Sequence, residues 1–549
     1  MAKSRNLMAF DLGASNGRAI LGQFDGERIS MRELHRFENN YIQMNGVFYW
    51  DTPYLYNNLK QGLLNFRQGG FGKLDAFGID TWGVDYGLLD KNGHLIGLPR
   101  SYRMSVQADV DTVTQIIPAD VLYSRSGMAT NQSFNTLYQL YRRKREDDVA
   151  LANAETMLMT PDLLGYFLTG AKGTEYSIAT TSQLYNPTTR DWDWETIDIL
   201  GLPRRIFTKI EKSGTIRGHL RPELCEELGL NPAAFVAVGE HDTASSVAAI
   251  PGSGSFAFCS SGTWSLFGAE MEKPDLSPEA AAAKFSNEGT VQGTYRPLRN
   301  IIGMWIIQEC RRDWIKNGIN ITWDGVVAEA RKAEPLRSII DPDAPEFYAG
   351  GNMEKKIQDF CRRTGQPVPE TIGQVARCVY ESLALKYRHA LEGLEKMKGQ
   401  RIDSLNIVGG PINNKFLDQL IADALDREVV TGPVEGAAIG NLLDNLESMG
   451  LTPNEINIFV NLKLRERSEK EANIKVVVVE CNPENLSQIS KQLRHISGVD
   501  LYSYSLDNIQ QYPYKLSEKF DLIITTSSHA GYLESVVPAD NRVIRIALR

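Results

Sequence analysis

The sequence predicts an α/β protein with two similar domains and a small α/β appendage at its C-terminal end. Residues 6–12 and 18–24 have the apolar patterns of strands, and the small residues GASNG lie between them. A similar strand–turn–strand pattern returns at residues 255–271, with SGT at its turn. Residues 474–549 begin a new alternation of strands and helices. The repeated pattern predicts the two similar domains, and the new alternation predicts the appendage.

The length of the chain also requires several domains. A chain of 549 residues exceeds what one hydrophobic core ordinarily organises. We expect the domains to comprise residues 1–250, 251–441 and 442–549. The charged residues 462–473 are expected to form a solvated linker within the last of these segments.

The composition is that of a globular protein, with 42% hydrophobic and 23% charged residues. Its formal net charge of −9 disfavours non-specific binding of nucleic acid. The opening residues lack the pattern of a signal peptide, and no apolar run is long enough for a membrane span. We therefore expect a cytoplasmic protein, a monomer or small homo-oligomer, whose partners are small molecules rather than nucleic acid or membranes.

Cysteine and histidine are sparse and scattered along the chain. The six cysteines include no CxxC pair, and there are only seven histidines. Structural zinc sites usually show such closely spaced ligands, so zinc is disfavoured. Reduced thiols are the default expectation for a cytoplasmic protein.

The first candidate site is the segment Asp11–Arg18, in which a strand leads an aspartate into a tight turn. Gly13 and Gly17 would let N–H groups of the turn approach phosphate oxygens. Asp11 could bind Mg²⁺, which prefers one or two carboxylates together with phosphate oxygens. The alternative is an ordinary hairpin with a polar turn. No GxxxxGK[ST] motif occurs, so a nucleotide site in this chain would not be a P-loop.

The second candidate site is GEHDTA at residues 239–244, where a strand is predicted to end and a helix to begin near Asp242. The positive end of a helix dipole favours an ionised carboxylate, which can take a proton from a substrate hydroxyl. The alternative is that Asp242 only caps the helix, since Asp is a favoured cap residue. A serine-hydrolase triad that uses His241 is disfavoured because no GxSxG elbow occurs.

Two further segments of small residues would suit a nucleotide. Hydroxyl and N–H groups at residues 260–264 (SSGTW) can bind a second phosphate. The glycines at 409–410 and the small residues at 432–438 would let a flat ring such as adenine lie between helices. Each segment alone is weak evidence, whereas the order of all four along the chain is much more specific.

Taken in order, these segments resemble the FGGY carbohydrate kinases, which have two actin-like ATPase (ribonuclease H-like) domains around a cleft. The resemblance covers about Leu7–Asn441. It rests on AFDLGASNGR (9–18), NGVFYWD (45–51), GIDTWGVD (78–85), RSGMATNQSFNTLYQL (125–140), GEHDTASSV (239–247), SSGTWSLFG (260–268), NEGTVQGTYRPLRNIIGMWIIQEC (287–310) and IVGG (407–410).

The resemblance implies transfer of the γ-phosphoryl group of Mg-ATP to the 1-hydroxyl of a ketose, with L-rhamnulose as the expected substrate. Asp242 would take the proton of that hydroxyl. The N-terminal domain would bind sugar and phosphates, and the C-terminal domain the nucleotide. The residues carried over are Gly83, His241, Asp242, Thr243 and Asn300 for the sugar, and Ala14, Ser15, Asn16, Gly17, Arg18, Thr263, Gln308 and Gly410 for ATP. Two alternatives remain open: a kinase for fuculose or xylulose, and a sugar-responsive regulator built on an inactive kinase.

Three features qualify the resemblance. Cys361 and Cys378 lie where the family can carry a disulfide, although reduced thiols remain the default. Pro411 stands where the family usually has a third glycine, and it is expected to alter contacts at the adenine end because proline lacks an N–H and fixes φ. Residues 445–549 resemble instead the effector half of a GntR-type transcriptional regulator.

Overall fold

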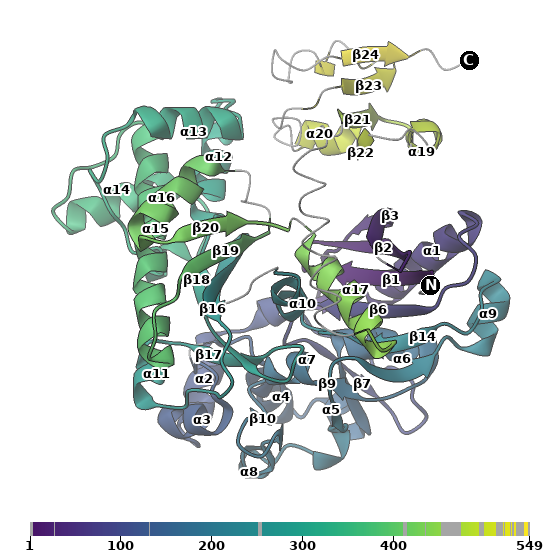
Figure 1. Ribbon diagram of the computed structural model, residues 1–549. Coiled ribbons are helices and arrows are strands. Elements are labelled where there is room, and N and C mark those ends of the chain that lie inside the picture. The colour runs from purple at the N-terminus through teal and green to yellow at the C-terminus, as the bar shows by residue number, and fades with distance from the viewer. Residues whose placement is uncertain are drawn as a thin grey trace. The chain divides into compact units, whose positions relative to one another are not determined.

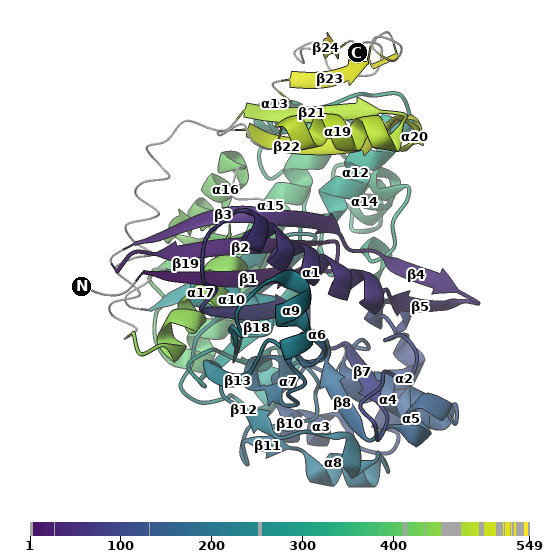
Figure 2. The ribbon, with the colours of Figure 1, turned by 90° about the vertical axis from the view of Figure 1, so that its right-hand side faces the viewer.

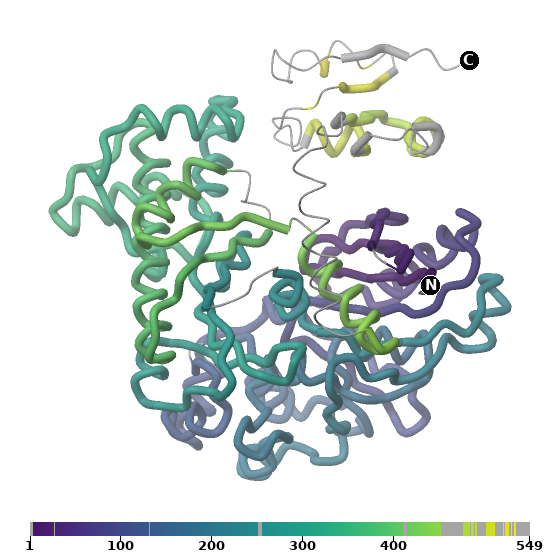
Figure 3. Tube along the Cα trace, in the orientation of Figure 1, coloured from purple at the N-terminus to yellow at the C-terminus, as the bar shows by residue number. Residues whose placement is uncertain are grey.

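The computed structural model describes the chain in two compact units, each of which is considered by itself. The first comprises Met1–Ile301, Tyr387–Asn413 and Leu425–Arg465, and the second comprises Ile302–Lys386, Asn414–Ala424 and Glu466–Arg549. The structure describes residues 4–26, 28–130, 132–250, 255–409, 414–433, 435–451, 474–493, 499–511, 520, 522–526, 529, 532–533 and 543–546, and Figure 3 shows the course of the chain.

Strand β1 (Arg5–Leu12) lies inside a six-stranded sheet of order β13-β14-β6-β1-β2-β3. Its other strands are β2 (Asn16–Phe24), β3 (Ile29–Glu38), β6 (Ala76–Thr81), β13 (Thr215–His219) and β14 (Ala234–Ala237). β1, β2 and β3 are antiparallel neighbours, whereas β6 runs parallel to both β1 and β14 (Figure 2). Every residue of β6 is buried, as expected for a parallel strand that is covered on both faces.

A second six-stranded sheet in the same unit has the order β17-β18-β16-β15-β19-β20. Its strands are β15 (Phe256–Ser261), β16 (Trp264–Ala269), β17 (Ser286–Gly289), β18 (Tyr295–Ile302), β19 (Ser404–Val408) and β20 (Glu428–Thr431). β15 pairs with β16 antiparallel and with β19 parallel, in the same way that β1 pairs with β2 and β6. The prediction that the strand–turn–strand pattern repeats is therefore confirmed.

The first unit also contains short strands and helices, many of which are labelled in Figure 1. The short strands form four two-stranded pairs: β4 (Tyr41–Met44) with β5 (Val47–Trp50), β7 (Tyr86–Leu89) with β8 (Thr156–Met159), β9 (Thr174–Glu175) with β12 (Ile210–Glu211), and β10 (Tyr185–Asn186) with β11 (Asp191–Trp192). The helices are α1 (Thr52–Gln68), α2 (Gln107–Thr114), α3 (Ala119–Ser126), α4 (Thr136–Arg145), α5 (Val149–Asn153), α6 (Thr160–Thr169), α7 (Tyr176–Thr180), α8 (Trp194–Ile199), α9 (Pro222–Leu228), α10 (Asp242–Ala248), α11 (Pro278–Ala282) and α17 (Gly436–Ser448).

Helix α1 shows how local sequence directs the packing on the first sheet. The Asp51 carboxylate caps the helix by accepting the N–H of Tyr54 at 3.0 Å. Its buried residues Leu55, Leu59 and Leu63 recur at helical spacing and pack in one core with residues of β1 and β6.

Helix α17 connects the end of the family-like segment to the first sheet. It runs without a break from Gly436 to Ser448, so the domain boundary expected at residue 441 falls inside it. Leu442, Leu443 and Leu446 are at most 5% exposed and pack in one core with residues of β1 and β2. A Cβ atom at Gly440 would overlap the carbonyl oxygen of Ser245, so glycine is required where α17 meets α10.

The second unit contains helices and the appendage. The helices are α12 (Trp305–Lys316), α13 (Trp323–Lys332), α14 (Met353–Arg363) and α16 (Lys415–Leu425), and the long α15 (Ile372–Lys398) begins there. The appendage has α19 (Pro483–Leu493), α20 (Leu506–Gln511) and a sheet of order β22-β21-β23-β24. Its strands are β21 (Ile474–Glu480), β22 (Val499–Ser505), β23 (Leu522–Thr526) and β24 (Val543–Ile546). The predicted linker at 462–473 lies outside the described residues. Within the described part of the chain, no helix is long and apolar enough to cross a membrane.

Candidate active site

Three aspartates approach one another at one edge of the first sheet. Asp11 and Asp80 are directly paired in the register of the parallel strands β1 and β6, one residue before each strand ends. Thr81 forms an isolated parallel bridge with His241, which brings Asp242 to the same edge. Because the carboxyl ends of parallel strands meet at one edge, residues far apart in the sequence converge there. Asp242 was predicted to act at this point, whereas Asp80 was not singled out.

Asp242 is the first residue of α10 rather than its cap. The cap position belongs to His241, and the Asp242 side chain is 31% exposed. Its Oδ1 accepts the Thr243 hydroxyl at 3.1 Å. The predicted strand-to-helix junction is therefore confirmed, and the capping alternative loses its basis. A partly exposed carboxylate at a helix N-terminus is placed to accept a proton from a ligand.

Burial and mutual repulsion act on the two strand aspartates. Burial raises the pKa of Asp11, and the nearby carboxylate of Asp242 raises it further. Burial raises the pKa of Asp80 well above its ordinary value, and the charge of Asp11 adds to this. Asp80 Oδ2 accepts the amide of Asn441 at 2.8 Å. Among the described residues its Oδ1 is buried without a hydrogen-bond partner. A cation bound at this edge would favour the ionised form of both carboxyl groups.

Arg18 lies between two acidic groups. Its guanidinium donates to Asp11 Oδ2 at 2.5 Å and also pairs with Glu435, in the segment that leads into α17. Arg18 thus links β2 to the loop before α17, within the first unit. Arg18 was predicted from the resemblance to contact phosphate, and in the structure its charge is balanced by these two carboxylates.

The turn between β1 and β2 is held by β3. The N–H of Asn39 donates to the Ser15 carbonyl at 3.0 Å, and the Asn39 amide donates to the Gly13 carbonyl at 2.8 Å. Ser15 and Asn16 are exposed in this turn, whereas Ala14 is half-buried. A Cβ atom at Gly17 would overlap the ring of Phe37, so packing requires glycine there, and the approach of a phosphate stays a prediction.

His241 is held by a buried ion pair. Its Nδ1 lies 3.0 Å from Glu288 Oε2, which also accepts a hydrogen bond from Arg296 at 2.7 Å. Although burial opposes it, the neighbouring His241 and Arg296 hold the pKa of Glu288 below its ordinary value. The other ring nitrogen, Nε2, lies 3.6 Å from Asp242 Oδ1. Glu288 and Arg296 therefore orient the imidazole beside Asp242.

Gly83 lies in a tightly built turn after β6. A Cβ atom there would come within 3.0 Å of Thr181, whose hydroxyl accepts the N–H of Val84 at 3.0 Å. Val84 has a φ of 69°, a conformation that costs a β-branched residue free energy. Strained backbone of this kind is concentrated at functional sites, and the role of Gly83 in the sugar site stays a prediction.

Asp85 organises two tryptophans beside this turn. Its Oδ2 accepts the indole N–H groups of Trp50 at 2.6 Å and Trp82 at 3.0 Å, and its Oδ1 accepts the Gln139 amide at 3.0 Å. The two indole rings lie 4.2 Å apart between centroids. Burial raises the pKa of Asp85 to about 6. This buried polar centre was not identified from the sequence.

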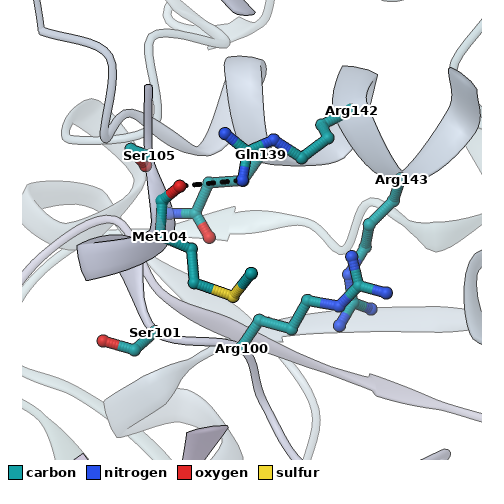
Figure 4. Close-up of a pocket in the computed structure, with 7 residues that line it drawn as sticks. All are labelled: Arg100, Ser101, Met104, Ser105, Gln139, Arg142 and Arg143. Carbon is teal, nitrogen blue, oxygen red and sulfur yellow. Dashed lines mark hydrogen bonds between the residues drawn. The ribbon is translucent and has the colours of Figure 1, made fainter. Parts of the chain in front are cut away.

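A small cavity lies behind Gln139 (Figure 4). Arg100, Met104, Arg142 and Arg143 also line it, and Arg142 donates to the Met104 carbonyl at 2.9 Å. Arg100 pairs with Asp148 at 2.6 Å, and Arg142 pairs with Asp109. Because acidic side chains already balance these arginines, the cavity is a poor candidate for an anion site.

Replacing Asp85 with asparagine is expected to lower the free energy of unfolding by about 1–3 kcal/mol, because an amide N–H₂ must then face a donor. The raised pKa means that the folded chain binds this proton more tightly than the unfolded chain does. Its stabilising contribution therefore falls as the pH rises from about 4 to about 6. The difference in free energy of unfolding between the parent chain and Asp85→Asn, measured by urea denaturation, should therefore become smaller over that pH range. A deficit that stays constant with pH would contradict the raised pKa.

Several predicted residues are not joined to these aspartates by any described contact. Thr263 is exposed in the turn between β15 and β16. Asn300 is on β18, where alternation places it on the same face as Arg296. Gln308 is on α12 in the second unit. Gly410 and Pro411 lie outside the described residues.

Cys361 on α14 and Cys378 on α15 are free, buried thiols. A hydrogen bond between them lowers the pKa of Cys361 and raises that of Cys378. They are thus close together, and the disulfide itself stays a prediction.

The sequence contained a usable signal for Asp80. It ends an apolar strand before a turn, as Asp11 does, so the pattern of FDLG is partly repeated in IDTWG. Glu288, Arg296 and Glu435 gave no such signal, because their roles depend on pairing between distant segments.

Comparisons with known proteins agree with this geometry. The family model for the N-terminal domain of the FGGY family of carbohydrate kinases matches residues 7–249, and that for the C-terminal domain matches residues 257–444. Rhamnulokinase from Bacteroides thetaiotaomicron is 41% identical over 449 residues, which cover 81% of this chain and 91% of that protein. Rhamnulokinase from Enterobacter sp. is 40% identical, with 80% and 88% covered.

A solved structure of xylulose kinase from Lactobacillus acidophilus has a TM-score of 0.70 at 16% identity and covers 84% of this chain and 98% of its own. This likeness confirms the predicted fold. The relatives and the two family models, which together span most of the chain, show that it belongs to the FGGY family of carbohydrate kinases.

Proposed function

We propose that this chain transfers the γ-phosphoryl group of ATP to the 1-hydroxyl of L-rhamnulose, giving L-rhamnulose 1-phosphate and ADP, in the catabolism of L-rhamnose. The observation that carries the proposal is the position of Asp242, partly exposed at the first turn of α10, beside the edge that holds Asp11 and Asp80. The naming of relatives at 34–41% identity as rhamnulokinases supports the choice of substrate.

Asp242 would act as the general base in this reaction. The carboxylate would accept the proton of the sugar hydroxyl as its oxygen attacks the γ-phosphorus, and the ADP oxygen would leave on the opposite side. His241 would hydrogen-bond the sugar beside it, with its ring oriented by Glu288 and Arg296. Thr243, Gly83 and Asn300 would complete the sugar site. Positioning and charge stabilisation are the main demands of phosphoryl transfer, and rigid buried supports of this kind meet the first.

The ATP phosphates would contact the turn formed by Ala14, Ser15, Asn16 and Gly17, with Arg18 at its end. The exposure of Ser15 and Asn16 leaves their hydroxyl, amide and backbone groups accessible to phosphate oxygens. Thr263, Gln308 and Gly410 are proposed to bind the rest of the nucleotide.

The residues present also fit Mg²⁺. Asp11 and Asp80 are adjacent in the sheet, both have raised pKa values, and a buried oxygen of Asp80 has no hydrogen-bond partner among the described residues. These two carboxylates would hold the ion, which has the ligand preference that such a pair satisfies. When bound, Mg²⁺ would offset the negative charge of the ATP phosphates.

Removal of Mg²⁺ is expected to abolish ADP release, because the phosphate charge would then face uncompensated carboxylates. Activity should return on addition of Mg²⁺ after chelation by EDTA. Asp80→Asn should raise the Mg²⁺ concentration needed for half-maximal rate. An unchanged Mg²⁺ requirement in that variant would remove Asp80 from the proposed site.

An ADP-release assay with L-rhamnulose, L-fuculose and D-xylulose tests the substrate. The proposal expects the highest kcat/KM for L-rhamnulose, with the phosphate at the 1-position of the product. A higher kcat/KM for either other ketose would overturn the choice of sugar. Binding of L-rhamnulose without ADP release would instead favour a regulator built on an inactive kinase.

The remaining predictions concern the location and the appendage. A cytoplasmic location is proposed, since the expected reaction consumes intracellular ATP. The resemblance of residues 445–549 to a GntR-type effector segment stays a prediction, because the family models that match this chain end at residue 444. The proposed appendage is an α/β unit, and its described strands and helices are consistent with that class.

A further inference from the structure

The sheet of the appendage contains a topological switch point. The strands β21 and β22, β21 and β23, and β23 and β24 all pair in parallel. From β21 the chain passes through α19 to β22 on one side, and it then returns through α20 to β23 on the other side of β21 (Figure 2). The strand that follows β21 in the chain lies on one side of this pair and the strand that follows β23 lies on the other, so the order of strands reverses between β21 and β23. In open parallel sheets, ligands bind in the crevice that such a reversal leaves at the carboxyl ends of the strands.

Three metal-binding side chains meet at this position. Glu480 ends β21, Cys481 follows it, and His529 comes shortly after β23. Cys481 Sγ lies 3.1 Å from His529 Nε2, which lies 3.2 Å from Glu480 Oε1. Cys481 Sγ and Glu480 Oε1 are also 3.2 Å apart. Within the described part of the chain, no other group of three or more acidic, histidine or cysteine side chains has its ligand atoms close enough together to hold one metal ion.

The spacing of the three atoms suits a tetrahedral ion. Bonds of about 2.0–2.3 Å to zinc place neighbouring ligand atoms roughly 3.3–3.7 Å apart, so outward movements of a few tenths of an ångström would suffice. Glu480 is buried, and its Oε1 also accepts the backbone N–H of Cys481 at 2.9 Å, which fixes the carboxylate. Cys481 is exposed and the His529 side chain is 18% exposed, so an ion could enter from solvent.

We propose that Glu480, Cys481 and His529 bind one divalent transition-metal ion of the zinc class, with a fourth position open to water or to a small ligand. Mixed sulfur, nitrogen and oxygen donors suit such a borderline ion, and three protein ligands with an open position are typical of sites that bind a further ligand. All three residues lie beyond residue 444, where the matched models of the kinase family end.

A nucleophilic cysteine is the competing interpretation of the same group. Activated thiolates typically lie beside a cationic group, whereas the Glu480 carboxylate lies 3.2 Å from Cys481 Sγ. Zinc was disfavoured at the level of the sequence because no CxxC pair occurs. That argument concerns ligands in short local loops, whereas here a sheet brings together donors from two segments that are distant in the sequence.

Cobalt(II) is the probe that separates this site from the kinase site. Untagged full-length chain, freed of metal by chelation, would be titrated with Co²⁺ and then with Zn²⁺. A thiolate-to-cobalt charge-transfer band is expected to saturate at one ion per chain and to disappear as Zn²⁺ displaces Co²⁺. The carboxylates of Asp11 and Asp80 cannot produce this band, since they contain no sulfur.

Cys481→Ser should eliminate the band, and His529→Ala should weaken Zn²⁺ binding by more than the ~10–100-fold typical of losing an outer-shell partner. Cys225→Ser and His219→Ala are the matched controls, because both residues belong to the first unit, and they should bind like the parent chain. Circular dichroism spectra and melting curves like those of the parent chain would confirm folding of every variant. Absence of the band in the parent chain, or its persistence in Cys481→Ser, would overturn the site.

Discussion

Asp242→Asn is expected to fold normally and to lose ATP-dependent phosphorylation of L-rhamnulose by about 10²–10⁴-fold in kcat, the usual contribution of a general base. Asparagine has almost the same shape, and its carbonyl oxygen can still accept the Thr243 hydroxyl. It cannot take up a proton from the sugar. Since the cap of α10 is His241, the substitution leaves the start of the helix intact. Initial rates of ADP release at saturating sugar would measure the loss.

Asp120→Asn is the matched control for this experiment. Asp120 is also in the first turn of a helix, α3, and is exposed at a position that the proposed reaction does not use. It should retain the parent kcat and melting temperature. An Asp242→Asn chain with nearly the parent kcat would remove Asp242 as the base, whatever its effect on KM.

Ending the chain after Asn441 is expected to destroy the folded kinase, whereas ending it after Leu451 should preserve it. The shorter chain lacks Leu442, Leu443 and Leu446, which pack against the first sheet. Each buried leucine is worth about 2–5 kcal/mol when truncated to alanine. Losing three of them approaches the total stability of about 5–15 kcal/mol that is usual for a domain.

Polar contacts add to this expected loss. Asp444, which the shorter chain also lacks, accepts the backbone N–H of Gly239 at 2.6 Å, close before Asp242. The two truncations differ only in residues 442–451, so both remove the appendage and the comparison isolates the end of α17. Thermal melting and ADP release would be measured for both. Equal melting temperatures would show that the buried leucines do not hold the sheet together.

The local parts of the fold follow from sequence patterns. The strand predicted at 6–12 and the strand–turn–strand pattern predicted at 255–271 are continuously or alternately apolar, and both correspond to observed elements. The brief α20 was not predicted, since a short segment has little periodicity. The order of strands could not be derived from residue patterns alone, because it depends on pairing between segments hundreds of residues apart. The resemblance to a family supplied that part.

The candidate site was likewise predictable from the sequence only in part. Asp11 and Asp242 stand next to turn or helix signals that are visible in the sequence. The partners of Arg18 and His241 come from other segments, and nothing near Glu435 or Glu288 in the sequence reveals these pairings. Gly17 shows a different limit, since its packing against Phe37 is not visible in the sequence, while its predicted approach to a phosphate stays a prediction. Tertiary contacts decide such roles, and a single sequence taken alone does not reveal those contacts.

The contact of α17 with α10 has a consequence for synthesis on the ribosome. Strands β1 and β6 and helix α10 emerge first, yet the helix that packs against all three ends only at Ser448. Chains fold from the N-terminal end as they are made, at about 5–20 residues per second. After Asp242 is made, roughly 200 further residues, or about 10–40 seconds of synthesis, must follow before Asp444 can bind Gly239. A nascent chain should acquire sugar-kinase activity late and abruptly, once α17 has left the exit tunnel.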